Sequence, residues 1–380
     1  MRAGYSMYVQ NAGDWDRFEA QERGEDVSGK PVRPDNDIWR EELELVHQVE
    51  DLGFDSLWCV EHHFTPYTMV PNPLQLLSYM AGVTTRMDMG TMVVVLPWHD
   101  PIRVVEELIM LDTFLGPDRD VRMAVGRGLG RREFGGFGIH MDESRPRFQE
   151  ALDIIKLGLT EDRFSYDGEF FKIPESTIRP RPRDGQRILD NMHCAWGSME
   201  SMEIAAANGL KPVVIPSKSY KEYEPELERY TELRAEQGLG PVGPVVAVHA
   251  YCAETEEAAY EGAKRHLDKY GDTVNRHYEF SGGHLAELKS YQHYAEKYKK
   301  AQETGAVQTG NVFLDEHIWG TPEMCIEKIE RLRAMMHASS EIVFMMKFGE
   351  MSYGEAESSV RLFGQEVLPA VHEMADAVPA

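Results

Sequence analysis

An acidic residue and two histidines, Glu61, His62 and His63, directly follow the apolar run 56–60. An imidazole changes charge near neutral pH, so a histidine in a pocket can take up or release a proton during a reaction. Successive residues of an extended chain point to opposite sides, so the two histidines are not expected to share one ligand. We therefore expect one histidine to face a pocket and the other to support it.

Two other roles for this histidine pair stay open. A metal site would need a third ligand, for which His99, Asp100 and His140 are available, but no His-x-His spacing or helical histidine pair supports it. A purely structural pair would be satisfied by neighbouring side chains. Acid–base or oxyanion chemistry by one histidine is the favoured interpretation, and no metal is predicted.

A glycine-rich segment with an arginine at its centre, GRGLG at 126–130, follows another apolar run. A dinucleotide-binding fingerprint needs a helix to start at once, whereas here further glycines precede the next helical pattern, so that interpretation is weak. Arg127 stands between two glycines, where a small anion could reach its guanidinium group. Pairing of Arg127 with a surface acid is the alternative.

Small hydroxyl residues mark a second candidate anion site. Trp196, Gly197, Ser198 and Ser201 follow an apolar run and lead into a helical pattern. Hydroxyl groups at a helix start cap its free N–H groups, and the same amides can bind phosphate. Capping alone would explain the serines, but with Arg127 from the neighbouring strand they could form a phosphate cradle.

These groups need a scaffold that gathers the ends of several strands. Apolar runs of strand length alternate with amphipathic helical stretches, which is typical of βα units and a parallel sheet. The predicted strands are residues 2–9, 56–60, 88–96, 121–126, 188–195, 212–215, 245–251 and 341–346. Eight such strands predict an α/β fold of the (β/α)8 TIM-barrel type in a single domain, residues 1–380, with the site at the carboxyl ends of the strands.

Two segments interrupt this alternation. Residues 11–37 are polar and acidic and follow the first strand, and residues 264–315 follow the seventh. In a barrel both segments would emerge at the carboxyl-terminal face, where active-site lids occur. We expect 264–315 to be a lid insertion; surface decoration or an oligomer contact is the alternative.

The composition excludes several classes of protein. The chain has 380 residues, a net charge of -24 and no lysine- or arginine-rich block, so a nucleic-acid partner is not expected. No apolar run approaches the roughly 20 residues of a membrane span. The four cysteines form no Cys-x-x-Cys pair, and the first residues lack the pattern of a signal peptide. These features predict a cytoplasmic protein without a membrane partner.

Several motifs together resemble one known family. EHHF at 61–64, NPLQLL at 72–77, GTMVVVLPWHDPIRVVEELIMLD at 90–112, GRGL at 126–129 and WGTPEMCIEKI at 319–329 look like the bacterial luciferase-like flavin-dependent monooxygenases. The similarity covers residues 2–369. It implies a (β/α)8 barrel that binds FMN, usually as reduced flavin (FMNH2) delivered by a separate flavin reductase. It also implies that O2 reacts at the flavin C4a atom to form a hydroperoxide, which oxygenates a small-molecule substrate. A homodimer is typical of the family.

The resemblance also implies roles for individual residues. His62 corresponds to the active-site base and His63 to its neighbour, while Arg127 corresponds to an arginine that contacts the flavin phosphate. The other implied cofactor-binding residues are Glu61, Met92, Val93, Trp196, Gly197, Ser198 and Ser201. Met92-Val93 matches a non-proline cis peptide bond under the flavin ring.

Two departures from the family pattern limit what the resemblance implies. Gly197 stands where the luciferase catalytic chain has an acid, and Gly126 replaces a cysteine beside the flavin in light-emitting members, so luminescence is not predicted. The implied activity is hydroxylation or Baeyer–Villiger oxidation of a largely apolar molecule. An F420-dependent hydride-transferring oxidoreductase, a flavin-binding protein without turnover and a metal-dependent barrel hydrolase are the alternatives.

Overall fold

The computed structural model describes residues 1–31, 33–216, 218–280, 283–288, 291, 299, 314–336, 339 and 341–374. Within these residues eight parallel strands form a barrel, because β11 pairs with β1 and closes the sheet. The barrel strands are β1 (Arg2–Met7), β2 (Ser56–Cys59), β3 (Asp88–Val95), β4 (Val121–Gly126), β7 (His193–Ala195), β8 (Lys211–Val214), β9 (Val245–Cys252) and β11 (Glu341–Met345). The predicted (β/α)8 barrel is confirmed.

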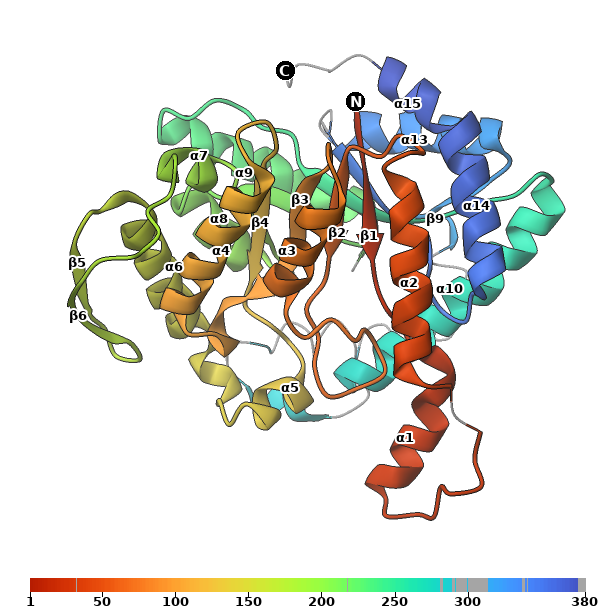
Figure 1. The fold of residues 1–380 in the computed structure, drawn as a ribbon, viewed down its shortest axis with the longest axis horizontal. Coiled ribbons are helices and arrows are strands. Elements are labelled where there is room, and N and C mark those ends of the chain that lie inside the picture. Colours follow the sequence, from red (N-terminus) through yellow and green to blue (C-terminus); the bar gives the residue numbers. More distant parts are fainter. Residues whose placement is uncertain are drawn as a thin grey trace.

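Helices pack around this barrel and bury the apolar faces expected from the sequence (Figure 1). The main helices are α2 (Asp35–Val49), α3 (Pro73–Val83), α4 (Pro101–Leu115), α6 (Ser144–Thr160), α8 (Met199–Ala207), α9 (Glu224–Glu236), α10 (Glu256–Tyr278), α13 (Pro322–Met335) and α14 (Tyr353–Glu366). The shorter helices are α1 (Trp15–Glu22), α5 (Arg131–Gly136), α7 (Gly185–Asp190) and α15 (Leu368–Glu373). Single 3-10 turns are η1 (Ala12–Asp14), η2 (Leu96–Trp98), η3 (Met141–Glu143), η4 (Tyr220–Tyr223) and η5 (Gly283–Glu287).

A buried ionic network closes the amino-terminal end of the barrel. The carboxylate of Glu341 accepts hydrogen bonds from Ser56, Arg122 and, at 3.2 Å, from the indole N–H of Trp58. Trp58 fills the barrel interior, and a side-chain carbon at Gly90 would lie only 2.3 Å from its ring. This end is therefore packed and charged, which leaves the opposite end for ligands.

The carboxyl ends of the strands point toward α1, α5 and the end of α10, in the lower part of Figure 1. The polar segment 11–37 forms α1 and its flanking turns there, as predicted. The predicted lid, 264–315, begins too early, because α10 continues as a regular helix to Tyr278 and ends at Glu279, whose φ is 51°. Most of the segment 281–313 lies outside the described residues, so its role as a lid stays a prediction.

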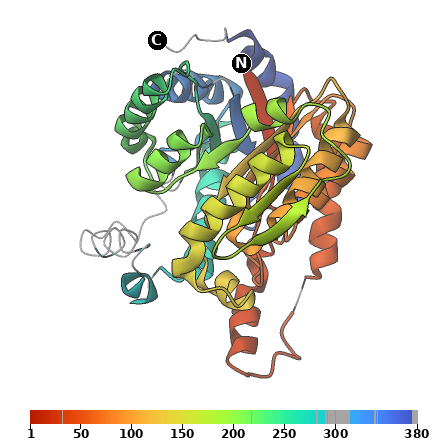
Figure 2. The ribbon, with the colours of Figure 1, turned by 90° about the vertical axis from the view of Figure 1, so that its left-hand side faces the viewer.

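Three elements differ from the sequence-based expectation. The fifth barrel strand starts at His193, not at 188, because Asp184 caps the short helix α7 and Ile188 lies inside it. An antiparallel hairpin, β5 (Phe164–Asp167) and β6 (Lys172–Ser176), lies outside the barrel beside α6 (Figure 2). The short strand β10 (Ile318–Gly320) pairs with the end of β9.

No helix in the described part of the chain is both long and apolar enough to cross a membrane.

Candidate active site

His62 lies beside a buried carboxylate at the carboxyl end of β2. Its Nδ1 atom is 3.0 Å from Oε1 of Glu133, and the same oxygen accepts the backbone N–H of His63 at 2.9 Å. The other carboxylate oxygen of Glu133 is 3.4 Å from Nε2 of His277. Burial by itself would raise the pKa of Glu133, but its attraction to His62 and hydrogen bonds to both histidines outweigh burial and lower the pKa to about 2.

His63 has a different set of partners, as the alternation of an extended chain predicts. Its Nε2 atom lies 3.1 Å from Oε1 of Glu61, and its ring packs against Trp98 and Phe137. The two histidines therefore do not share a ligand. His62 faces the aromatic side chains of α10, while His63 faces the end of β3 and α5.

Glu61 connects the ends of β2 and β3. Its side chain is fully buried, and it accepts the backbone N–H of Val95 at 2.7 Å while lying 2.7 Å from Nε2 of His99. Burial would raise the pKa of Glu61, but His99, His63 and the Val95 amide together lower it. These contacts tie the end of β2 to the end of β3.

Aromatic side chains enclose His62. Its ring centroid lies 4.8 Å from those of Tyr67 and His277 and 5.9 Å from that of Tyr278. The Tyr67 hydroxyl is 3.0 Å from the Tyr270 hydroxyl, and burial raises the pKa of both tyrosines well above the usual value. The side chains of Tyr67 and Tyr270 near His62 are therefore uncharged, and their hydroxyl groups are their polar atoms.

His249, near the end of β9, adds a buried imidazole with two unsatisfied nitrogens. Within the described residues neither ring nitrogen has a hydrogen-bond partner, and the rings of Tyr8, Tyr270 and Phe348 surround it. Burial, followed by the nearby His317, lowers its pKa well below the usual value, so the ring is neutral. A buried polar group of this kind is a candidate contact for a ligand or a water molecule.

The two residues predicted to lie under a flavin ring are in β3, where it pairs with β4. The Met92-Val93 peptide bond is cis, at the irregular point in the pairing of the two strands. A side-chain carbon at Gly126 would lie 2.5 Å from Cγ2 of Val93, and Gly128 has a φ of 80°. The glycines of the GRGL motif therefore permit close approach of the backbone to Val93 and a left-handed turn.

The predicted anion site gains a second arginine. The Arg127 guanidinium carbon lies 4.3 Å from the ring centroid of Tyr291, and Nη2 of Arg145 lies 2.6 Å from Glu200. The other terminal nitrogen of Arg145, Nη1, is buried without a hydrogen-bond partner. Burial and then the like charge of Arg127 lower the pKa of Arg145, whereas Glu200 raises it. A buried guanidinium donor without a partner suits a bound anion.

The predicted serines lie at the start of helix α8. Ser198 is the N-cap residue, and its hydroxyl accepts the backbone N–H of Ser201 at 3.3 Å and donates to the Ser201 hydroxyl at 3.1 Å. Gly197 precedes them and adds no side chain. Trp196 is placed differently: its indole N–H donates to Glu226 and its ring stacks on Tyr230, so it anchors the loop to α9.

Sequence reasoning missed Glu133, His277 and Arg145, which contact or flank the predicted groups. Glu133 follows the GRGLG segment closely, and a side-chain carbon at Gly130 would lie 2.2 Å from its carboxylate. Gly130 therefore indicates that a side chain packs closely against the backbone there, and Glu133 is that side chain. His277 and Arg145 carry no local signal, because their positions follow from the packing of α10 and α6 against the barrel.

A metal site at His62 would use other ligands than His99, Asp100 or His140, which the sequence offered. Within the described residues, the atoms that could share an ion belong to His62, Glu133 and His277, all within 4.8 Å of one another. Asp100 instead caps α4, and His140 caps η3. Nδ1 of His62 and the His63 amide share one oxygen of Glu133, whereas the other oxygen of Glu133 and Nε2 of His277 have no hydrogen-bond partner among the described residues.

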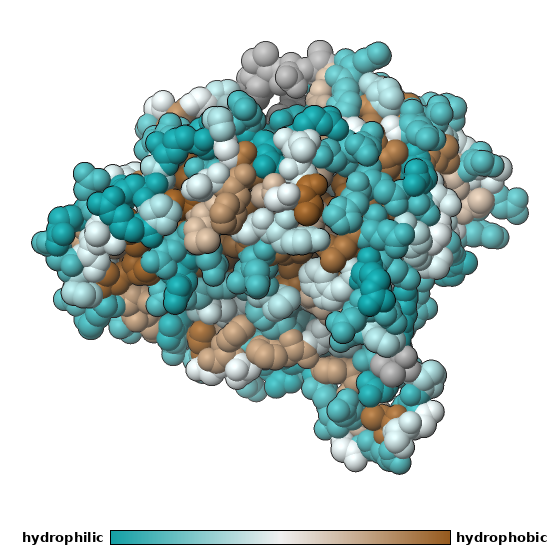
Figure 3. Space-filling model, viewed as in Figure 1, coloured by the Kyte–Doolittle hydropathy of each residue, from teal (hydrophilic) through white to brown (hydrophobic). Residues whose placement is uncertain are grey.

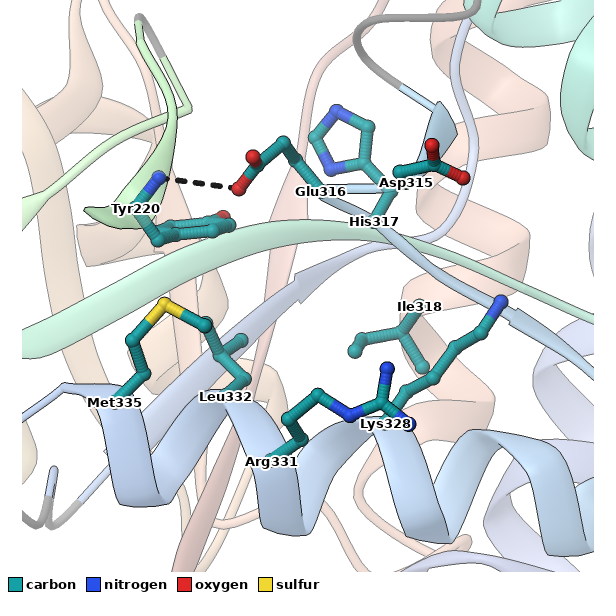
Figure 4. Close-up of a pocket in the computed structure, with 9 residues that line it drawn as sticks. All are labelled: Tyr220, Asp315, Glu316, His317, Ile318, Lys328, Arg331, Leu332 and Met335. Carbon is teal, nitrogen blue, oxygen red and sulfur yellow. Dashed lines mark hydrogen bonds between the residues drawn. The ribbon is translucent and has the colours of Figure 1, made fainter. Parts of the chain in front are cut away.

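A separate cavity of about 200 Å³ lies between η4, β10 and α13 (Figure 4). Its lining residues are Tyr220, Asp315, Glu316, His317, Ile318, Lys328, Arg331, Leu332 and Met335. The Tyr220 amide donates to Glu316 at 3.1 Å, and burial lowers the pKa of Lys328 to about 8. None of the predicted site residues lines this cavity.

Comparison with known proteins agrees with this geometry. The family model described as luciferase-like monooxygenase matches residues 20–338. The alkanal monooxygenase alpha chain of Photorhabdus luminescens is 30% identical over 210 residues, which cover 55% of this chain but only 57% of that protein. The oxygenase component of flavin-dependent trigonelline monooxygenase of Acinetobacter baylyi is 25% identical over 88% of this chain and 91% of that protein.

Solved structures share the fold at low sequence identity. Monooxygenase RslO1 of Streptomyces bottropensis has a TM-score of 0.74 with 20% identity, covering 98% of this chain and 100% of that one. The oxygenating constituent of 3,6-diketocamphane monooxygenase of Pseudomonas putida, a Baeyer–Villiger enzyme in complex with FMN, has a TM-score of 0.70 with 17% identity, covering 97% and 98%. An F420-dependent secondary alcohol dehydrogenase has a TM-score of 0.67 with 14% identity, covering 97% and 98%.

Proposed function

This chain belongs to the luciferase-like monooxygenase family, and from that premise we propose that it is the oxygenase of an FMN-dependent two-component monooxygenase. It would use reduced FMN and O2 to hydroxylate a small, largely apolar molecule or to insert oxygen beside its carbonyl group. The observation that carries this proposal is the combination of His62 with an anion cradle at the same end of the barrel. Both sit where barrel enzymes hold their substrates.

The residues present fit the phosphate of FMN. Arg127 and Arg145 supply two guanidinium groups, one with an unused buried donor, and Ser198 and Ser201 supply hydroxyls at a helix start. Charge-assisted hydrogen bonds to a phosphate are the strong kind, and they would also relieve the repulsion between the arginines. Val93 would support the flavin ring. Bound reduced FMN would supply the electrons that activate O2.

His62 would move a proton at its Nε2 atom, since Nδ1 is occupied by Glu133. The uncharged wall of Tyr67, Tyr270 and Tyr278 would keep bulk water away from the reacting groups and would suit an apolar substrate. His63 and Glu61 would hold the chain that carries His62, through their contacts to the end of β3.

A separate flavin reductase and a homodimer belong to the same proposal. The trigonelline relative is named as an oxygenase component, which supports a separate reductase.

A groove between α2 and α3 is lined largely by apolar residues, including Leu43, Leu76 and Tyr79, and apolar side chains are visible near the centre of that face (Figure 3). A second copy would cover this groove, and sedimentation velocity would test the dimer. Four free, buried cysteines suit the reducing cytoplasm.

Hydride transfer with F420 is the second candidate, favoured by the likeness to an F420-dependent dehydrogenase. Both cofactors carry phosphate, so the anion cradle does not choose between them. Anaerobic titration with reduced FMN and with reduced F420 would separate them, because the proposal requires tight binding of FMN and much weaker binding of F420.

The proposal is tested by mixing the anaerobic complex with reduced FMN against oxygenated buffer. We expect a transient absorbance that precedes oxidised flavin, and substrate-dependent oxygen incorporation from a panel of apolar compounds. The variant His62→Ala should bind FMN normally but form product roughly 100-fold more slowly or oxidise flavin without product. Flavin binding without any oxygen chemistry would instead identify a flavin-binding protein, and unchanged product yield in His62→Ala would remove the role of His62.

A further inference from the structure

The carboxylate of Glu133 lies between two imidazoles that come from different parts of the chain. One oxygen is 3.0 Å from Nδ1 of His62 after β2, and the other is 3.4 Å from Nε2 of His277 in the last turn of α10. All three side chains are buried or nearly so, with 14% exposure for His62 and 0% for the other two. An ionised carboxylate can only accept, so Nδ1 of His62 must carry its hydrogen; the contact to His277 lacks hydrogen-bond geometry, and a hydrogen on Nε2 is the arrangement that avoids repulsion there.

The hydrogen bonds around His277 agree with this assignment. Its Nδ1 atom is 2.8 Å from the hydroxyl of Thr65, which can donate to a ring nitrogen that carries no hydrogen. Burial lowers the pKa of His277, so this ring is neutral, with one donor toward Glu133 and one acceptor toward Thr65. Tyr67 stacks on the ring at 4.7 Å and 25° and fixes its plane.

We infer that Glu133 and His277 are positioning residues that hold His62 with its hydrogen on Nδ1 and Nε2 free to accept a proton. This inference rests on the proposed function, because it assigns the support of the same base. Glu133 fixes the tautomer and balances the charge when His62 becomes protonated. His277 orients the second carboxylate oxygen, so the geometry of the base depends on the placement of α10.

The surroundings of His62 make Glu133 its dominant electrostatic partner. Within the described residues, the titratable groups that face His62 are Glu133 from α5, Tyr67 from the segment after β2, and His277 and Tyr278 from α10. The tyrosines are neutral hydroxyls and His277 is neutral, so Glu133 alone carries a charge there. Arg132, which acts on His277, already pairs with Glu22 and Glu279.

The first test is the variant Glu133→Gln, which keeps the shape and removes the charge. In histidine-selective ¹⁵N NMR of the free protein, we expect the wild-type His62 to show the Nδ1–H tautomer, and the ¹⁵N chemical shift of Nδ1 to change in the variant because its charged acceptor is gone. In single turnovers with reduced FMN, product formation should fall roughly 10- to 100-fold. FMN affinity should change less than about threefold.

Two further variants separate positioning from folding. His277→Gln keeps a donor toward Glu133 and an acceptor toward Thr65, so it should recover most of the product yield that His277→Leu loses. Glu143→Gln is the matched control: Glu143 pairs with Arg147 at 2.8 Å and has 36% side-chain exposure, and the His62 ¹⁵N shifts and the product yield should stay at wild-type values.

An unchanged ¹⁵N shift of His62 Nδ1 in Glu133→Gln would overturn the inference, as would the Nε2–H tautomer in the wild-type protein. Tight binding of one Zn²⁺ ion in calorimetry, lost in His277→Leu, would also overturn it, because the cluster would then be a metal site. The NMR readout needs no turnover. If the protein failed to oxygenate any substrate, the proposed function would fail while the tautomer and the Nδ1 shift of His62 could still bear out the arrangement of His62, Glu133 and His277.

Discussion

The variant Glu61→Gln tests how the end of β2 is held. The wild-type carboxylate meets three donors: the Val95 amide at 2.7 Å, His99 at 2.7 Å and His63 at 3.1 Å. A glutamine side chain can offer its oxygen to the Val95 amide and its NH2 group to the two histidines, so His99 and His63 lose the acceptor that they have in the wild type. Hydrogen bonds to a charged group contribute about 1.5–3 kcal/mol, and an unsatisfied buried donor costs about 1–3 kcal/mol. We expect a loss of about 3 kcal/mol in the free energy of unfolding.

The size of this loss should depend on pH. The pKa of Glu61 is lowered in the folded state, so its stabilisation is present above the unfolded carboxyl value of about 4.3 and is lost as pH falls below it. Burial alone would lower the pKa of His99, but its attraction to Glu61 raises it above the value in the unfolded chain. The stability that protonated His99 contributes is therefore complete below pH about 6.5 and is lost as the pH rises through the pKa of His99 in the folded protein. Both contributions coexist between about pH 4.5 and 6.5.

Unfolding of wild type and variant should therefore be compared at pH 5.5 and pH 9. We expect the difference to be larger at pH 5.5 by about 1–2 kcal/mol. At about 2.1 cal/mol/K per residue, a loss of 3 kcal/mol lowers the Tm of a chain of this length by about 4 °C. The control His372→Gln removes a half-exposed partner of Asp55 and should cost less than about 1 kcal/mol. An equal loss at both pH values would refute the argument about His99.

Three other predictions concern the cofactor site and the opposite end of the barrel. Gly126→Ala places a carbon 2.5 Å from Val93, so it should cost about 1–3 kcal/mol of stability and weaken FMN binding in a fluorescence titration; unchanged affinity would contradict the close approach. Arg145→Ala should weaken FMN binding roughly 10- to 100-fold and leave riboflavin binding unchanged, because only FMN carries phosphate. Glu341→Gln should lower stability by about 3 kcal/mol, since it leaves Arg122 short of a buried partner, while kcat per folded molecule stays the same.

The sequence predicted the parts of the molecule whose signals are local. The apolar runs located the eight barrel strands, and alternation along an extended chain correctly separated His62 from His63. The capping role of Ser198 and the cis bond at Met92-Val93, the latter from family resemblance, were also predicted. Each of these features depends on residues that are neighbours in the chain.

The features that were missed depend on contacts between distant segments. His62, Glu133 and His277 meet only after β2, α5 and α10 pack together, and no spacing in the sequence encodes that meeting. The start of the fifth strand was wrong because the apolar Ile188 belongs to a helix whose cap, Asp184, competes with the strand pattern. The β5–β6 hairpin had a usable signal, the Asp167-Gly168 pair between two short alternating runs.

The connection that begins with α10 leaves strand β9, and its last element, β10, pairs with the same strand. Helix α10 begins shortly after β9, and β10 returns to pair with it through Ile318↔Ala250, Trp319↔Tyr251 and Gly320↔Cys252. Barrel closure therefore does not depend on the length of residues 279–317, and doubling such a segment costs only about 0.6 kcal/mol of loop-closure entropy. A shorter or longer segment between Tyr278 and Ile318 would therefore leave the pairing of the eight barrel strands in place, whereas replacing Glu279 or Tyr291 would remove contacts to Arg131 and Arg127.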